Sequence, residues 1–307
     1  MTGEASSVVE RDGVGEPAGI EDEQAARQAR RRWRLRRLGW TVGVIVAVVV
    51  VVGIVLRTTP WPSALAIRAV FEQGAKETIA EMQRYVPDVD LEEHRDLDYG
   101  GGDGQTLDVF SLPGGEARPT VVWIHGGAWI SGAKGDVEPY LRILAAEGYT
   151  TVAIDYSIAP EQIYPTAVGQ ANDALAYLEA QAGDLGIDPE RIVIAGDSAG
   201  SQLASQVAAL TTNAEYADLL DITPALDPDQ LVGAVLNCGV YDVQNMTGLD
   251  GLVGWGFQTA LWAYTGTQDW SVSAPGSLMS TIDFATGDFP RTFITGGNGD
   301  VTSTPRS

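Results

Sequence analysis

The residues best suited to chemistry in this sequence surround Ser198. The serine stands in the run Gly-Asp-Ser-Ala-Gly at 196–200, after an apolar run at 192–195 and before a helix-forming stretch at 201–208. A serine on a tight turn between a strand and a helix presents its hydroxyl as a nucleophile toward a carbonyl carbon. Small neighbours are needed because this strained turn leaves no room for larger side chains. The pattern predicts acyl transfer through Ser198.

Two adjacent glycines, Gly126 and Gly127, follow an apolar strand expected at 120–124. Glycine lets the backbone approach a ligand closely and direct N–H groups at it. Attack on an ester produces an oxyanion that needs such donors, and the N–H of Ala199, directly after the serine, would supply another. Alone, His-Gly-Gly would indicate an ordinary turn at the end of a strand. About 70 residues before a serine turn, it favours an oxyanion hole.

The general base that Ser198 would need is harder to find. The chain has only two histidines, His94 and His125, and both precede the serine. In this strand–turn–helix context the base normally follows the nucleophile, in the order serine, acid, histidine. His125 begins the glycine turn and His94 is expected in an exposed early strand, so we expect neither to act as the base.

Together these motifs resemble α/β-hydrolases of the hormone-sensitive-lipase-like esterase group. The resemblance extends from about residue 120 to 208, and more faintly to 300; it depends on 125–129, 155–161, 164–165 and 196–200. It implies an α/β-hydrolase fold, with a mostly parallel central sheet and helices on both faces. It also implies hydrolysis of carboxylic esters through an acyl-enzyme. Ser198 would be the nucleophile, with the N–H groups of Gly126, Gly127 and Ala199 as the oxyanion hole and Asp197 in a structural role.

Asp300 is the candidate for the acid of the triad. It ends the run Gly-Gly-Asn-Gly-Asp at 296–300, which follows a short strand at 292–295 and resembles the acid-bearing strand end of the family. An aspartate in an ordinary turn is the alternative. The family continues with a helix, a strand and a histidine loop, whereas 301–307 is short and polar. We therefore predict a C-terminally truncated chain that lacks the final strand and helix, with low esterase activity and an exposed edge strand at 292–295.

Two classes of function fit these motifs. The first is a membrane-anchored serine hydrolase acting on small-molecule esters, impaired because its catalytic histidine is missing. The second is a non-catalytic α/β-hydrolase-like module that binds a hydrophobic ligand or a protein partner. Peptidase activity also stays open, because ester and amide hydrolysis use the same groups. The sequence leaves the oligomeric state and the ester undetermined.

A membrane segment is expected at 38–56, which is uncharged and rich in Val and Ile. Its 19 residues would form a helix of roughly 28 Å, close to the thickness of the bilayer interior. A basic block precedes it, so we expect a single-pass anchor with a cytoplasmic N-terminus and the large domain outside. A cleaved signal peptide is the less favoured alternative, because its apolar core is usually shorter. Residues 1–37 are expected to form a disordered cytoplasmic tail that ends in this basic block.

Charge and composition exclude other classes. Residues 1–37 hold eight Arg and seven acidic residues, and the remainder holds 11 basic and 34 acidic residues. Such an acidic domain repels polynucleotides, so no nucleic acid partner is expected. The single cysteine, Cys238, rules out an intrachain disulfide and is expected to be buried on a core strand. No Cys/His cluster is present, so we expect no metal and no cofactor.

Alternating strand and helix patterns assign 88–307 to the hydrolase domain. Before it, an amphipathic helix within 57–87 could lie on the membrane, cover a pocket or simply pack on the domain. Residues 213–230 are expected to form an exposed loop or irregular helix, and 247–284 either a pocket wall or a packed connection. The remaining strands are expected at 91–99, 106–112, 151–155, 191–195 and 232–236, and helices at 137–147 and 167–182.

Overall fold

The computed structural model describes residues 19–102 and 104–296. The chain divides into two compact units, Met1–Thr58 and Thr59–Ser307. In the first unit, α1 is a single helix over Gly19–Thr58. Its part from Glu23 to Thr58 is long and apolar enough to cross a membrane, a test that signal sequences also pass. Large apolar side chains are exposed on every face of this helix, because no described residue of the unit packs against them.

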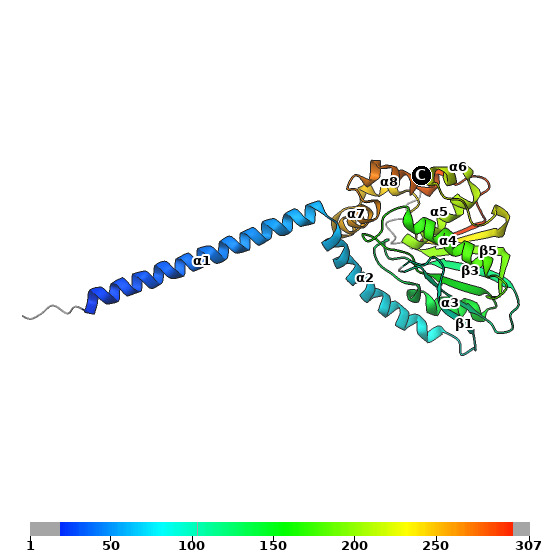
Figure 1. Cartoon of the computed structure of the whole chain (residues 1–307), viewed down its shortest axis with the longest axis horizontal. Coiled ribbons are helices and arrows are strands. Elements are labelled where there is room, and N and C mark those ends of the chain that lie inside the picture. The colour runs from blue at the N-terminus through cyan, green and yellow to red at the C-terminus, as the bar shows by residue number, and fades with distance from the viewer. Residues whose placement is uncertain (1–18, 103, 297–307) are drawn as a thin grey trace, which may run out of the picture. The chain divides into compact units, whose positions relative to one another are not determined.

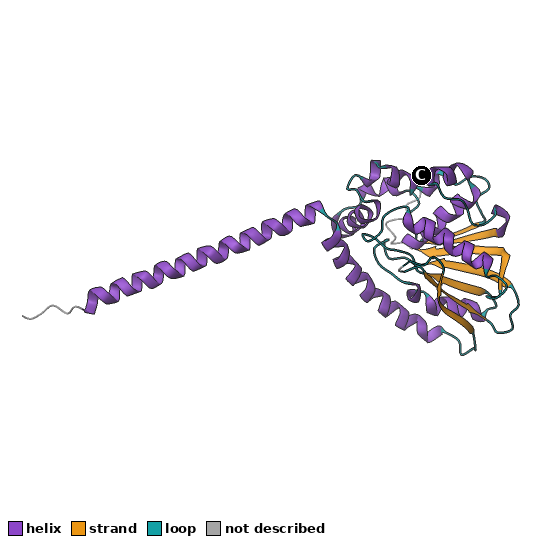
Figure 2. Ribbon diagram, viewed as in Figure 1, coloured by secondary structure: helices purple, strands orange, loops and turns teal. Residues whose placement is uncertain are grey.

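The second unit contains a seven-stranded sheet in the order β1-β2-β4-β3-β5-β6-β7, with helices packed around it (Figures 1 and 2). From β4 to β7 every neighbouring pair is parallel, whereas β1 and β2 are antiparallel to each other and β2 is antiparallel to β4. The expectation of a mostly parallel sheet is therefore confirmed. The strands are β1 Glu92–Asp98, β2 Thr106–Ser111, β3 Arg118–Ile124, β4 Thr150–Ile154, β5 Ile187–Asp197, β6 Leu231–Asn237 and β7 Thr292–Thr295.

Helices cover both faces of the sheet, as the continuous apolar strands require. Along β3, Val122 and Ile124 belong to a large core with α4 and α5, whereas Trp123 belongs to a smaller core with α3. Successive strand residues point to opposite faces, so α3 lies on one face and α4 with α5 on the other. The helices of this unit are α2 Trp61–Met82, α3 Glu138–Ala146, α4 Thr166–Ala180, α5 Ala199–Thr212, α6 Ala214–Leu220, α7 Gly251–Thr265 and α8 Ala274–Leu278.

Two sequence expectations need correction. Residues 213–230 are not simply exposed, because α6 buries Tyr216 completely, and its hydroxyl oxygen lies 2.9 Å from Gln206 Oε1 and 2.8 Å from the carbonyl oxygen of Leu278, within hydrogen-bond distance of both. Cys238 is exposed rather than buried: it lies just past β6 with a φ of 52°, where the chain leaves the sheet.

The strand β7 is the outer strand on its side of the sheet as described. Phe293 and Ile294 are 63% and 60% exposed. The expected exposed edge is therefore present in the residues that the structure describes. Apolar residues on an open edge are a template for pairing with another chain.

Candidate active site

Ser198 occupies a strained turn between β5 and α5, with φ 51° and ψ −118°. Non-glycine residues rarely take such angles, and holding one there costs of order 1–3 kcal/mol. The flanking glycines permit it. A Cβ on Gly196 would lie 2.5 Å from the carbonyl carbon of Gly200, and one on Gly200 would lie 2.1 Å from the carbonyl oxygen of Ile124. The sequence folds this way locally because only glycine fits at both positions.

Backbone hydrogen bonds hold the turn from both sides. The N–H of Ser198 donates to the carbonyl of Asn237 at 2.8 Å, and the carbonyl of Ser198 accepts from the N–H of Gln202 at 3.1 Å. The Asn237 side chain receives a hydrogen bond from Thr295 Oγ1 at 2.8 Å and lines the pocket in front of the serine. Sequence reasoning missed Asn237. Its position at the end of β6, beside the serine strand, was the available signal.

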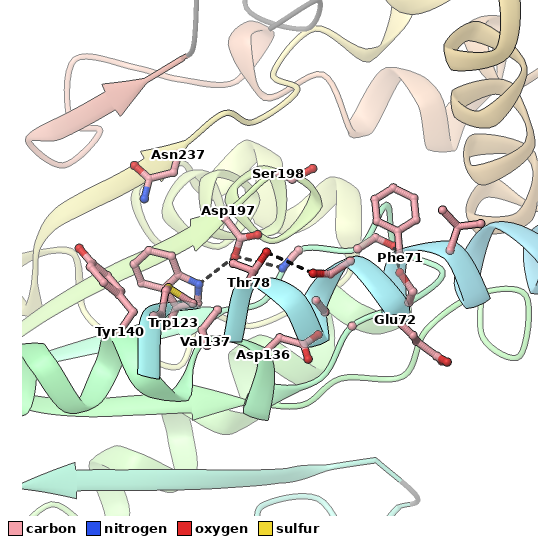
Figure 3. A pocket seen from close by; sticks show the side chains of 18 residues that line it. Phe71, Glu72, Thr78, Trp123, Asp136, Val137, Tyr140, Asp197, Ser198 and Asn237 are labelled. Carbon is pink, nitrogen blue, oxygen red and sulfur yellow. Dashed lines mark hydrogen bonds between the residues drawn. The ribbon is translucent and has the colours of Figure 1, made fainter. Parts of the chain in front are cut away.

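Ser198 opens into a pocket of about 650 Å³ (Figure 3). Gly126 and Gly127 line the same pocket, so the structure brings the predicted nucleophile and the glycine turn together. The opposite wall comes from α2, which contributes residues from Val70 to Met82. The amphipathic helix therefore covers the pocket, one of the placements that the sequence left open.

The two glycines of the turn differ in what their N–H groups do. That of Gly126 donates to Asp197 Oδ1 at 3.2 Å, and the indole N–H of Trp123 donates to the same oxygen at 3.0 Å (Figure 3). Burial raises the pKa of the Asp197 carboxyl, and these donors act against that shift. Asp197 thus ties the glycine turn to the serine turn. Among the described groups, the N–H of Gly127 and that of Ala199 have no acceptor, which leaves them as the available oxyanion donors.

His125 is not among the residues that line the pocket of Ser198. Its ring is 1% exposed and stacks on Tyr156 with the ring centres 4.3 Å apart. Nδ1 lies 2.8 Å from the carbonyl oxygen of Gly126, and Nε2 lies 3.9 Å from Asp155 Oδ1. Burial is the main cause that raises the pKa of the Asp155 carboxyl. The ring is therefore part of the framework under the glycine turn.

His94 lies on β1, separated from the serine strand β5 by three strands. Its Nε2 atom is 3.5 Å from Glu92 on the same strand. Asp300 lies outside the described residues. The strand that leads toward it, β7, is parallel to β6 and ends at Thr295, whose carbonyl accepts from the N–H of Cys238. Within the described residues, the Ser198 hydroxyl has no hydrogen-bond partner.

Arg68 holds α2 over the pocket through hydrogen bonds and an ion pair. Its guanidinium donates to the carbonyls of Ile130 at 2.6 Å and Ala159 at 2.9 Å, and it forms a paired contact with both carboxylate oxygens of Glu161 at 2.8 and 2.7 Å. The hydrogen bond to Arg68 lowers the pKa of Glu161. Glu161 belongs to the 155–161 motif on which the family resemblance depends, whereas sequence reasoning missed Arg68. A single arginine on the apolar side of this helix was the signal.

The comparison with known families decides the assignment. Residues 107–304, more than half of the chain, match the family described as BD-FAE. The chain belongs to the BD-FAE family. The serine turn, the glycine turn, β3–β7 and all but the first residue of β2 fall inside the matched residues, whereas α1, α2 and β1 lie before them.

Curated relatives of this BD-FAE chain are named as esterases. Esterase LipQ of Mycobacterium tuberculosis is 34% identical over 161 residues, which is 49% of this chain and 36% of LipQ. Carboxylesterase NlhH of the same species is 39% identical over 93 residues, 30% of this chain and 29% of NlhH. The chain thus aligns with about a third of the length of these relatives. In these aligned residues the chain resembles proteins named as carboxylic-ester hydrolases.

Solved structures show the same fold. Esterase B from Lactobacillus rhamnosis superposes with a TM-score of 0.65 at 23% identity, over 77% of this chain and 75% of that one. An esterase from Pyrobaculum calidifontis gives 0.55 at 22% identity, over 75% and 73% of the two chains. These similarities confirm the α/β-hydrolase fold for the BD-FAE chain.

Proposed function

We propose that this chain binds small carboxylic esters at Ser198 and transfers their acyl group to the serine. One observation carries the proposal: Ser198 on its strained turn shares a pocket with the Gly127 turn, and Ala199 follows the serine directly. The closer assignment, to the hormone-sensitive-lipase-like esterase group, is supported by the motifs at 125–129 and 155–161.

The proposed reaction uses few groups. Ser198 Oγ attacks the ester carbonyl carbon and loses its proton, and the N–H groups of Gly127 and Ala199 stabilise the oxyanion that forms. The carbon–oxygen bond to the alcohol then breaks, the alcohol takes up a proton, and the acyl group stays on Ser198. Water releases the acid in the second half of the reaction. We propose Asp300 as the acid of the triad.

The proposed reaction needs a group that accepts the proton of the Ser198 hydroxyl. Neither His94 nor His125 lines the pocket of Ser198. A triad enzyme that loses its nucleophile or base falls by roughly a million-fold in kcat and keeps a residual acceleration from the oxyanion hole and binding. We therefore expect slow turnover by these 307 residues, because catalysis would depend on solvent as the base.

Hydrolysis of p-nitrophenyl acetate by the full chain in lipid nanodiscs tests this proposal. We expect slow release of nitrophenol that Ser198→Ala abolishes and that added imidazole accelerates. If the wild type turns over fast and Ser198→Ala abolishes that activity, the expectation that no side chain acts as the base is wrong. A slow rate that is the same in both proteins would contradict Ser198 as the nucleophile.

A non-catalytic binding module is the second candidate. It is favoured by the Ser198 hydroxyl, which has no hydrogen-bond partner in the part of the chain that the structure describes. A butyrate ester that binds the wild type and Ser198→Ala equally well, with no acyl-serine seen by mass spectrometry, would favour this candidate.

We propose that α1 anchors the chain in a membrane with the N-terminus in the cytoplasm. The proposal is supported by the length and composition of 23–58 and by the arginines at its start. Cys238, the single cysteine, is exposed on the hydrolase unit and offers a direct test. We expect a membrane-impermeant maleimide to label Cys238 in intact cells. Labelling only after lysis would contradict this orientation.

A further inference from the structure

A second cavity of about 460 Å³ lies where α2 and α7 meet. Residues from both helices line it, together with Ala128 from the glycine turn. None of the lining side chains carries a charge, and the indole N–H of Trp255 is the only hydrogen-bonding group among them. We call this cavity the α2–α7 groove.

The groove leaves large apolar side chains in contact with water. Leu252 is 80% exposed and Val70 is 72% exposed, and Val253 and Trp255 are about half exposed beside them. Scattered exposed apolar residues are normal, but a group of them around a cavity marks a binding site. Burying them under an apolar ligand is favourable at about 25 cal/mol per Å².

The groove adjoins the pocket of Ser198. Val70 and Phe71 line both cavities. Gly127 lines the pocket and its neighbour Ala128 lines the groove, and consecutive Cα atoms are about 3.8 Å apart. A ligand held with its carbonyl oxygen at the Gly127 N–H therefore has the apolar groove as its neighbour, one residue away.

We propose that the α2–α7 groove binds an unbranched alkyl chain of the ester whose carbonyl group is held at Ser198. This inference rests on the proposed function and names its substrate class: esters with a medium or long aliphatic chain. Sugars, peptides and charged groups do not suit the groove, because they would lose water without gaining hydrogen bonds. A methylene chain has no polar groups that would lose water, so it can fill the apolar groove without this cost.

Gly256 provides a way to block the groove. It lines the cavity on α7, and a Cβ at this position would meet no atom within 4 Å. Gly256→Phe therefore places a ring in the groove without a backbone clash. Gln258→Phe is the matched control, because Gln258 is exposed on the same helix and does not line the groove.

The experiment measures binding of butyl-, hexyl- and octylboronic acids to the full chain in lipid nanodiscs, with empty discs as the blank. Ser198 Oγ forms a bond to the trigonal boron and its proton passes to the buffer, which gives a tetrahedral boronate anion. We expect affinity to rise about fourfold for each added methylene. In Gly256→Phe we expect butylboronic acid to bind as in the wild type and octylboronic acid to lose the chain-length gain. Gln258→Phe should behave as the wild type.

An unchanged chain-length dependence in Gly256→Phe would overturn the groove proposal. Octyl acetate serves as a competitor, and a selective loss of its affinity in Gly256→Phe would support the groove proposal with the alcohol's chain in the groove. If butylboronic acid binds the wild type no better than Ser198→Ala, the proposed function fails separately. The groove is then decided by 1-octanol, which should bind Ser198→Ala but not Ser198→Ala/Gly256→Phe. Equal binding to both would refute the groove.

Discussion

The Nδ1 atom of His125 lies 2.8 Å from the carbonyl oxygen of Gly126, and this contact fixes the direction of the next N–H. A carbonyl can only accept, so Nδ1 carries the hydrogen. The peptide between Gly126 and Gly127 is planar and trans, so its N–H points opposite to its carbonyl. The hydrogen bond from His125 to the carbonyl therefore orients the Gly127 N–H toward the opposite side of the peptide. It is a positioning residue for the proposed oxyanion hole.

We expect His125→Phe to weaken binding of butylboronic acid roughly tenfold, because the Gly126 carbonyl loses a buried donor. Phenylalanine keeps a ring to stack on Tyr156, so the fold should persist. The measurement is the boronate affinity together with the near-UV circular dichroism spectrum. His94→Phe is the control, and equal boronate affinities in the two variants would show that His125 does not aim the peptide.

We expect Gly200→Ala to destabilise the hydrolase unit by about 3 kcal/mol or more, because the new methyl group would overlap the backbone of β3. Gly135→Ala is the control, since a Cβ there meets nothing within 4 Å and should change stability by less than about 0.5 kcal/mol. Urea unfolding followed by tryptophan fluorescence provides the comparison. Similar midpoints for the two variants would mean that the serine turn is looser than the structure indicates.

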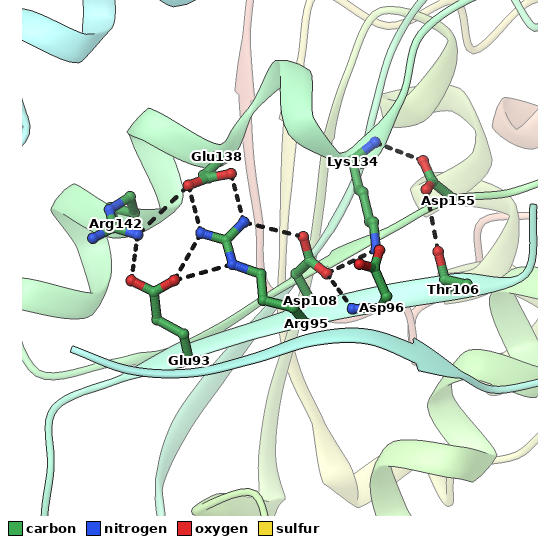
Figure 4. A network of polar contacts seen from close by, with 9 residues as sticks. All are labelled: Glu93, Arg95, Asp96, Thr106, Asp108, Lys134, Glu138, Arg142 and Asp155. Atoms are coloured by element: carbon green, nitrogen blue, oxygen red, sulfur yellow. Dashed lines mark hydrogen bonds and ion pairs between the residues drawn. The ribbon is translucent and has the colours of Figure 1, made fainter.

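A network of charged residues joins β1 and β2 to α3 (Figure 4). Arg95 forms hydrogen bonds to Glu138 at 2.7 and 2.8 Å, and Arg142 contacts Glu93 at 2.6 Å. On the other side of this network, Lys134 contacts Asp108 at 2.7 Å. The hydrogen bond from Arg95 lowers the pKa of Glu138 below its ordinary value.

The lowered pKa of Glu138 determines how the stability of the hydrolase unit depends on pH. A carboxyl with a lowered folded-state pKa contributes stability above its ordinary pKa, and this contribution is lost as pH falls through the folded-state pKa. We therefore expect Glu138→Gln to lower the urea midpoint at pH 7, and we expect the difference from the wild type to shrink as the pH falls below about 4.5. Glu147→Gln, which removes an exposed carboxylate from the end of α3, should follow the wild type at every pH. A constant difference between Glu138→Gln and wild type across this range would contradict the ion-pair explanation.

The open edge of the sheet predicts self-association. Ile294 on β7 is 60% exposed beside a strand edge with which no described residue pairs. We expect Ile294→Lys to reduce light scattering at high protein concentration several-fold, because a charge on an edge strand opposes pairing with another chain. Ile282→Lys removes a similarly exposed isoleucine that is not on a strand, and it should have little effect. Equal effects of the two changes would indicate nonspecific hydrophobic association rather than pairing of strand edges.

The sequence was most informative where local chemistry and local structure coincide. The serine turn needs small residues on both sides of Ser198, and the strands of the sheet centre need apolar runs, so both could be recognised from neighbouring residues alone. The strand starting at Thr292 was recognised in the same way.

Contacts between distant segments could not be predicted in this way. An amphipathic helix shows that one face is covered but not by what, so the position of α2 over the pocket needed the structure. The tie between Arg68 and Glu161 spans 93 positions, and neither residue's neighbours indicate the other. Cys238 was wrongly placed because its apolar neighbours continue past the point where the strand ends.

Seven positions of the pocket wall belong to α2, at Val70, Phe71, Glu72, Gly74, Ala75, Thr78 and Met82, and all of them precede the first residue of the BD-FAE match. Selection on these positions can change which molecules are admitted while the reactive centre stays constant. Related proteins with near-identical cores can therefore differ in substrate preference by exchanging a single N-terminal segment. Grafting that segment between paralogues would be a compact route to new selectivity.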